Sequence, residues 1–162
     1  LLIESFYEIQ KKYLNLYLVI LGEGELKSKL KKIVSNLGID NKVIFLGFQK
    51  NVFNYLSNGE CFILTSEWED PGFVLIEAAF SKIPIISSNC PNGPKEILED
   101  GDGGYLYTLN SKNDLLEKFK QFKNENDSFI KKRKELVLRQ SKKYTHFRHF
   151  LNLQKILFSS VR

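Results

Sequence analysis

Short apolar runs alternate with helical patterns along this chain, and that alternation limits the available folds more than any other feature. The runs expected to be strands are 16–21, 43–46, 61–65, 83–87 and 104–107. Between them, the spacing of apolar residues predicts a helix over 25–37, a short one over 52–57, and one from Ser111 to about Lys123. This alternation predicts an α/β fold, a Rossmann-like parallel sheet with helices on both faces.

Composition places the chain among soluble globular proteins. Its 162 residues suffice for one compact domain, and 43% hydrophobic with 27% charged residues is ordinary for that class. No apolar run approaches the length of a membrane span, and no secretory signal opens the chain. Cys61 and Cys90 are too few for a disulfide framework and lack the spacing of metal ligands, which favours a reducing, cytoplasmic setting.

The segment 66–80 carries most of the functional information. It places Glu69 and Glu77 eight residues apart, with Pro71 and Gly72 between them and an apolar run around Glu77. Proline is tolerated in the first turn of a helix, so a helix is expected to begin near Pro71 or Gly72. Glu69 then lies just ahead of that helix, and Glu77 lies about two turns inside it.

Each of these two acids also has a purely structural interpretation. Most helical glutamates lie on a solvated face, and an acid near a helix start is favoured by the helix dipole. The residues from Phe73 to Phe80 are apolar apart from Glu77, however, which predicts a helix buried on most sides. An unpaired buried carboxylate costs several kcal/mol, so Glu77 needs hydrogen-bond donors there. The vicinal hydroxyls of a sugar would supply them.

In a parallel sheet, ligands bind at the carboxyl ends of the strands, where helices present free amides. The third predicted strand and the helix after it aim the amides of Gly72, Phe73 and Val74 into this crevice, which suits an anionic diphosphate. Phe48 and Gln49 follow the second predicted strand and are candidates to bracket a base through their backbone. A plain turn is an equally good interpretation of those two residues.

The pattern Glu-x7-Glu within this segment resembles the signature of the group 1 (family 4) retaining glycosyltransferases. Flanking segments agree with that family in order and spacing. The matching segments are 18–26, 45–48, 51–52, 55–56, 66–78, 83–88, 93–97 and 103–107. The resemblance covers about 16–123 and implies the carboxyl-terminal, nucleotide-sugar-binding half of a GT-B fold. Among family members it is strongest to those that build surface polysaccharides.

Carried onto this sequence, the resemblance implies a role for each candidate residue. Glu69 would be the catalytic residue, hydrogen-bonded to hydroxyls of the donor sugar, and Glu77 would hold the ribose hydroxyls. The segment from Pro71 to Val74 would receive the diphosphate, and Phe48 and Gln49 would adjoin the base. The reaction would transfer a sugar from a nucleotide sugar to an acceptor hydroxyl with retention of configuration. The family needs no divalent metal, so neither metal nor cofactor is expected.

The resemblance also implies a domain boundary. The chain contains no methionine, and residues 1–6 already have the pattern of the middle of a helix, so we expect a piece of a longer protein. In the family this helix follows a strand and a loop whose arginine and lysine grip the diphosphate. We therefore expect residues 1–141 to form the donor-binding domain without its first strand, and 142–162 to be a helix that returns toward an absent amino-terminal domain. This fragment alone is expected to be inactive.

Other motifs are less specific. Gly22-Glu23-Gly24 lacks the third glycine of a dinucleotide-binding loop, and Lys27 stands in its place. The segment 91–96 follows a strand and begins a short helix, and it either faces a ligand or forms a structural turn. A surface turn is the preferred interpretation of the acids in 100–102. The histidines, His146 and His149, have no third metal ligand nearby and are expected on a solvated helix, with Thr145 as its cap.

Charge is concentrated in the carboxyl-terminal part of the chain. Residues 131–162 carry a net charge of +9, against −4 for residues 1–130. Their basic residues are Lys131, Lys132, Arg133, Lys134, Arg139, Lys142, Lys143, Arg148, Lys155 and Arg162. A solvated helical face is the default interpretation, and an anionic membrane surface comes second because lipid-linked acceptors are common in the resembled family. Nucleic acid comes last, since no aromatic platform accompanies the charge.

These observations lead to one functional hypothesis with two alternatives. The hypothesis is the donor-binding half of a retaining glycosyltransferase that takes a nucleotide-sugar donor and a glycan or lipid-linked acceptor in surface polysaccharide or glycan biosynthesis. Its expected location is the cytoplasm or the cytoplasmic face of the membrane, and no nucleic-acid partner is expected. The alternatives are a non-catalytic nucleotide-binding module and a basic, membrane-docking interaction domain.

Overall fold

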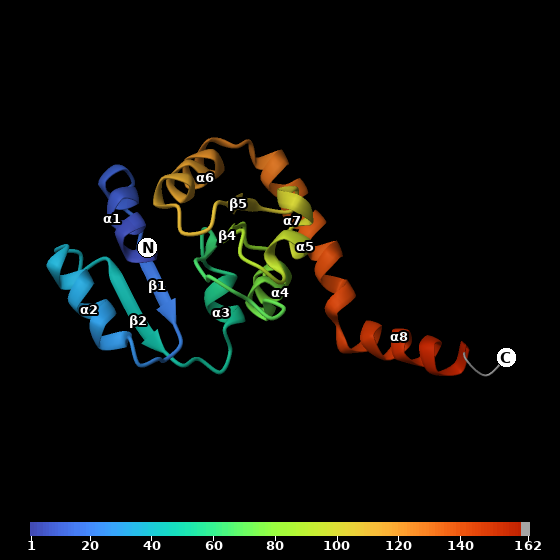
Figure 1. Ribbon diagram of the computed structural model, residues 1–162. Coiled ribbons are helices and arrows are strands. Elements are labelled where there is room, and N and C mark those ends of the chain that lie inside the picture. The colour runs from blue at the N-terminus through green and yellow to red at the C-terminus, as the bar shows by residue number, and fades with distance from the viewer. Residues whose placement is uncertain (160–162) are drawn as a thin grey trace.

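The computed structural model describes residues 1–159, and their strands and helices alternate as the sequence predicts (Figure 1). The strands are β1 (Leu18–Leu21), β2 (Val43–Gly47), β3 (Phe62–Leu64), β4 (Ile85–Ser88) and β5 (Tyr105–Tyr107). The helices are α1 (Leu2–Lys12), α2 (Lys27–Asn36), α3 (Phe53–Leu56), α4 (Phe73–Phe80), α5 (Pro94–Ile97), α6 (Lys112–Asn124), α7 (Asp127–Ser141) and α8 (His146–Ser159). Two 3-10 turns, η1 (Glu99–Gly101) and η2 (Lys142–Tyr144), complete the fold.

All strand pairs are parallel, which confirms the predicted α/β class, but within the described part of the chain the strands form two hydrogen-bonded groups. β1 pairs with β2, and β3, β4 and β5 form a separate sheet in that order. The sequence predicted a parallel sheet without specifying this break. Each group therefore has an edge strand, β1 or β3, that faces the other group.

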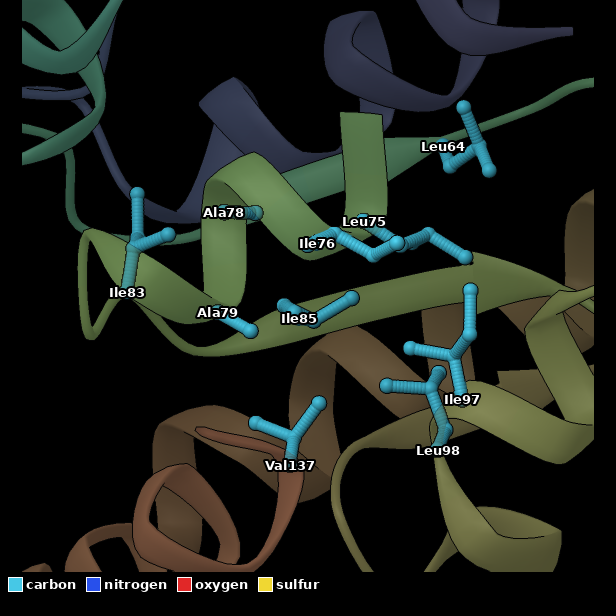
Figure 2. Packing of buried hydrophobic residues seen from close by; sticks show 10 residues of the cluster. All are labelled: Leu64, Leu75, Ile76, Ala78, Ala79, Ile83, Ile85, Ile97, Leu98 and Val137. Carbon is cyan, nitrogen blue, oxygen red and sulfur yellow. The ribbon is translucent and has the colours of Figure 1, made fainter. Parts of the chain in front are cut away.

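Helices cover both faces of the three-stranded sheet because its side chains alternate between them. In β4, Ile85 packs with α4, α5 and α7 in one cluster, which Figure 2 shows from close by. The next residue, Ile86, packs on the opposite face with α1 and α6. Both isoleucines are almost completely buried. A strand buried on both faces explains the apolar runs of the sequence.

The two-stranded group is covered differently. Helices α1 and α2 pack on one face through a cluster that includes Phe6, Val34 and Val43. On the other face, Val19 of β1 and Ile44 of β2 are exposed. The uninterrupted apolar pattern of β1 predicted cover on both faces, so the structure differs from the prediction at this strand. The apolar composition of a strand shows that both of its faces can be buried, but it does not show whether another element covers each face.

The predicted helix ends agree with the structure to within a few residues. Ser111 caps α6 by accepting a hydrogen bond from the Asp114 amide at 3.3 Å. The amide of Arg148 donates to Thr145 Oγ1 at 3.4 Å, as expected for the cap of α8. Figure 1 shows α8 extending away from the rest of the molecule. Its exposed apolar residues are Phe147, Phe150, Leu153, Ile156, Leu157 and Phe158.

Arg133, which the sequence placed within a solvated basic run, instead joins α7 to the start of β5. Its Nε donates to Glu125 Oε2 at 2.8 Å, and its Nη1 donates to the carbonyl of Gly101 at 2.8 Å. The hydroxyl of Tyr105 donates to the same Glu125 oxygen at 2.5 Å. Hydrogen bonds from Arg133 hold the pKa of the Glu125 carboxyl below its ordinary value.

Removal of this guanidinium should destabilise the domain. Because the pKa of Glu125 is lowered on folding, its carboxylate contributes stability at neutral pH that is lost as the pH falls below about 4.5. Arg133→Met should cost about 2 kcal/mol of unfolding free energy at pH 7 and flatten the loss of stability between about pH 6 and pH 3. Urea unfolding across that pH range measures both effects. The exposed Lys120–Glu117 pair provides a control, since Lys120→Met should change stability by less than about 0.5 kcal/mol. A variant Arg133→Met with wild-type stability at pH 7 would contradict this account.

Candidate active site

A groove of about 830 Å³ lies between the two strand groups. Side chains of β1 and β3 line it along its length, together with residues of α1, α3 and α4. At the carboxyl ends of the strands its lining includes Gly22 after β1, Phe48 and Gln49 after β2, and Ser66 after β3. The loops that the sequence placed at one edge therefore lie around one opening.

Glu77 lines this groove together with Val74 of the same helix. It is the fifth residue of α4, so it lies little more than one turn inside the helix and not two, because the helix begins at Phe73. Its side chain is half-buried, and its carboxylate makes no hydrogen bond or ion pair within residues 1–159. Glu77 thus presents a carboxylate to the groove with free acceptor capacity.

The helix face that carries Glu77 is more open than the sequence predicted. The opposite face, with Leu75, Ile76, Ala78 and Ala79, is buried in the core shown in Figure 2. Phe73 is 61% exposed, and Val74 and Phe80 are each 38% exposed. One apolar face of α4 borders the groove. From composition alone, an apolar face beside a groove cannot be distinguished from one that is buried in the core.

Glu69 lies directly ahead of α4, as predicted, with its side chain beside Gly72. A Cβ atom on Gly72 would lie 3.6 Å from the Cβ of Glu69. Gly72 caps the helix with φ 89° and ψ 49°, a left-handed conformation that glycine adopts at low cost. Pro71 precedes the cap and lies outside the helix, which begins at Phe73, one or two residues later than predicted. Glu69 is half-buried and, unlike Glu77, is not part of the groove lining.

The amino-terminal amides of α4 are available to a ligand. The first intrahelical bond runs from the Leu75 amide to the Gly72 carbonyl at 2.9 Å. The amides of Phe73 and Val74 come before it, where a helix has no partners of its own for its N–H groups. The helix dipole adds positive potential at the same place. Free amides and two carboxylates therefore occupy one short segment, which suits a ligand with both phosphates and hydroxyls.

Phe48 and Gln49 reach the groove in different ways. Phe48 is 78% exposed. The side chain of Gln49 is already engaged, because its Nε2 donates to the Leu46 carbonyl at 2.9 Å and its Oε1 accepts from Tyr55 at 2.9 Å. Gln49 thereby fixes the turn between β2 and α3. Its backbone, rather than its amide side chain, is what this turn offers to a ligand.

The loop after β4 supports residues 66–77, the carboxylate segment, and the sequence left the role of this loop open. Ser88 Oγ donates to the Ser66 carbonyl at 2.6 Å, and the Glu69 amide donates to the Pro91 carbonyl at 3.3 Å. Gly93 lies against Pro71 so closely that a Cβ on it would be 2.0 Å from the Pro71 carbonyl oxygen. These contacts favour the structural interpretation of the segment 91–96. The glycine before Pro94 was the one signal in the sequence for this close approach.

The acids of the turn 100–102 and the histidine His149 of α8 do not form a metal site in the described structure. Within residues 1–159, no group of three or more His, Cys, Asp or Glu side chains is arranged to hold a metal ion. Asp100 and Asp102 lie on an exposed turn, as the sequence predicted, and His149 is exposed on α8. No helix in the same range is long and apolar enough to cross a membrane.

The order of these loops and helices matches a known family. The profile described as "Glycosyl transferases group 1" matches residues 1–143, which is most of the chain. The chain belongs to the group 1 glycosyl transferases. The solved structures that resemble it are glycosyltransferases of GT-B architecture.

Two relatives and one solved structure are similar to this group 1 transferase chain. An uncharacterized glycosyltransferase of Methanocaldococcus jannaschii is 45% identical over 97 residues, which cover 60% of this chain and 24% of that protein. The poly(ribitol-phosphate) α-N-acetylglucosaminyltransferase of Staphylococcus aureus is 29% identical and covers 94% of this chain and 32% of that protein. The crystal structure of a mutant of S. aureus TarM, in complex with fondaparinux, α-GlcNAc-glycerol and UDP, has a TM-score of 0.85 at 27% identity and covers 97% of this chain and 32% of that chain. The matched part of this chain therefore spans about a quarter to a third of the length of these relatives.

Substitution of Gly93 should disturb the support of the carboxylate segment. Its φ is 131°, and the added Cβ of Gly93→Ala would clash with the backbone of Pro71. We expect a loss of at least about 2 kcal/mol of unfolding free energy, measured by urea unfolding. Gly24→Ala is the matched control, because a Cβ at Gly24 would have no neighbour within 4 Å. Equal stability of the two variants would show that the contact between Gly93 and Pro71 is absent in solution.

Proposed function

We propose that this group 1 transferase chain is the donor-binding domain of a retaining glycosyltransferase. The enzyme would transfer a sugar from a nucleotide sugar to an acceptor hydroxyl on a glycan or lipid-linked acceptor, in the biosynthesis of a surface polysaccharide or another glycan. The observation that carries this proposal is the placement of Glu77, the α4 amides and the loops after β1, β2 and β3 around one groove. UDP is the first nucleotide to test, because the similar TarM structure holds it.

Each part of this arrangement has a chemical task. Glu77 would accept hydrogen bonds from the ribose hydroxyls, and Glu69 from hydroxyls of the donor sugar. The amides of Gly72, Phe73 and Val74 would receive the diphosphate. Negative charge grows on the diphosphate as the glycosidic bond breaks, so amides fixed in advance stabilise the transition state more than the ground state. No part of this scheme requires a metal ion, and we propose that none takes part.

Titration of the chain with uridine, guanosine and adenosine diphosphates tests the proposal and identifies the base. We expect one of them to bind weakly, because the diphosphate-gripping cations implied by the family resemblance are not among residues 1–162. Calorimetry at low ionic strength is the measurement. If none binds to the fragment, or to the full-length protein, the donor-binding role fails. Binding by a full-length protein that transfers no sugar would instead support the non-catalytic nucleotide-binding module.

The two glutamates should differ in kinetics in the full-length enzyme. Glu77→Ala should weaken nucleotide binding about tenfold, because it removes charge-assisted hydrogen bonds to the ribose. Glu69→Ala should chiefly lower kcat, by about a hundredfold or more, because its contacts are proposed to act at the reacting sugar. Glu67→Ala is the control, since Glu67 is an exposed acid in the same segment. Wild-type kinetics in both Glu69→Ala and Glu77→Ala would remove the assigned roles.

We also propose that a parallel strand from upstream of Leu1 occupies the part of the groove between β1 and β3, leaves the opening at the carboxyl ends of the strands to the donor, and completes the domain of residues 1–141. The amide of Leu18 bonds to Lys42 on the β2 side, so by alternation the N–H groups of Val19 and Leu21 point toward the groove. The Phe62 amide likewise donates to the Pro84 carbonyl on the β4 side. By alternation the N–H group of Ile63 points toward the groove. Two strand edges that face one apolar groove suit one further strand.

The exposed apolar residues of α8 support a second interface. We propose that the segment 142–162 packs against an amino-terminal domain of the same protein, which would carry most of the acceptor site. Residues 160–162, including the basic Arg162, lie outside the described residues. An anionic membrane is the alternative partner, because α8 also carries exposed basic residues such as Arg148 and Lys155. Such a surface would place the enzyme at the cytoplasmic face of the membrane.

Liposome flotation separates these two partners of α8. If the membrane is the partner, the chain should float with vesicles that contain anionic lipid and not with neutral ones, and the binding should decrease in high salt. The variant Arg148→Gln/Lys155→Gln should then float less. If the amino-terminal domain is the partner, the full-length protein should remain unbound under the same conditions.

A further inference from the structure

Helix α5 is hydrogen-bonded to the end of α7 and to η2. The hydroxyl of Tyr144 donates to Glu96 Oε1 at 2.5 Å. The Gln140 side chain donates to the Glu96 carbonyl at 3.3 Å. Glu96 is therefore bound through both its side chain and its backbone. These partners are more than forty residues away in sequence, so the contacts tie two distant parts of the fold.

The other end of α5 rests on the carboxylate segment of the candidate active site. Gly93 caps α5 and lies against the Pro71 carbonyl, and the Ile97 amide donates to the Gly93 carbonyl at 2.8 Å. Helix α5 has four residues, so Glu96 and Gly93 lie within one turn of each other. A displacement of Glu96 would therefore move the backbone that supports Pro71 and, through the Pro91 carbonyl, the Glu69 amide.

Tyr144 is itself firmly placed. Its ring packs against the core cluster that contains Leu75 of α4, Ile97 of α5 and Val137 of α7 (Figure 2 shows these three residues). Burial, and then the neighbouring Glu96 carboxylate, raise the pKa of the Tyr144 phenol, so the hydroxyl stays protonated and donates throughout the physiological pH range. The next residue, Thr145, caps α8. Tyr144, which holds α5, is thus next to the start of α8.

We propose that Tyr144 and Glu96 are positioning residues for the donor, and that their hydrogen bond holds the segment from Glu69 to Gly72 in place through α5. This inference rests on the proposed function for its catalytic meaning. It deepens that function by adding two residues that lie outside the groove lining. Catalytic groups need close alignment with the reacting atoms, so a small shift of this segment would lower turnover even though neither residue contacts the donor.

Hydrogen exchange in the ligand-free chain tests the coupling directly. The Glu69 amide bonds to Pro91 and the Leu75 amide bonds to Gly72, so both report on the carboxylate segment. In Tyr144→Phe we expect both amides to exchange about fivefold faster, because a hydrogen bond that holds α5 is lost. Glu96→Ala should have the same effect. The double variant should match the single ones within about twofold, because the two residues act through one contact.

The domain offers a matched control for general destabilisation. Tyr105 also donates its hydroxyl to a glutamate at 2.5 Å, but that partner is Glu125, in the link between α6 and α7 and away from the carboxylate segment. Tyr105→Phe should lower the melting temperature at least as much as Tyr144→Phe and leave the exchange of the Glu69 amide unchanged relative to other amides. Equal acceleration in both variants, or no acceleration in Tyr144→Phe, would overturn the proposal.

Steady-state kinetics of the full-length enzyme then connect the coupling to catalysis. Tyr144→Phe should lower kcat about fivefold with less than a twofold change in KM for the donor, and Glu96→Gln, which keeps an acceptor oxygen, should retain most of the activity. Tyr105→Phe should leave both constants unchanged. A wild-type protein that binds no nucleoside diphosphate and transfers no sugar would reject the proposed function, while the exchange experiment would still decide whether Tyr144 and Glu96 hold the segment.

Discussion

The arrangement of the candidate active site depends on the burial of β4 on both faces. Ile85 and Ile86 point to opposite sides of the strand, and each is sealed by a different set of helices. The strand cannot shift along its length without exposing one of them, because a slip of one residue exchanges the two faces. Its carboxyl end is therefore fixed, and Ser88 at that end binds the Ser66 carbonyl. The position of the carboxylate segment follows from this.

Electrostatics then decide what this segment can bind. Its amides and the dipole of α4 favour anions, whereas Glu69 and Glu77 favour hydrogen-bond donors and disfavour anions. One kind of ligand satisfies both demands if its phosphates meet the helix start and its hydroxyls meet the carboxylates. A nucleotide sugar has this division of charge. This segment differs from a simple phosphate site because it also contains Glu77, whose carboxylate would repel an anion that offered no hydroxyl.

Much of the fold followed from the sequence, and particular residues show why. The apolar runs, the cap at Ser111 and the glycine at position 72 each express a local requirement of the backbone, so reading them required no knowledge of distant residues. Arg133 shows the opposite case. It stands in a run of basic residues, and only the fold brings the Glu125 carboxylate and the Gly101 carbonyl to its guanidinium. Composition alone could not separate it from its solvated neighbours.

The sequence by itself determined the α/β class, the positions of the strands and helices, and the segment in which two acids flank a helix start, because hydrophobic periodicity and backbone preferences are local. Tertiary structure decided three further features. It placed β1 and β3 on opposite sides of a groove, turned the Glu77 face of α4 toward that groove, and placed α5 between Tyr144 and Pro71. Those features depend on which apolar surfaces find partners across the chain, and an apolar residue has the same pattern in the sequence whether it is covered or lines an open groove.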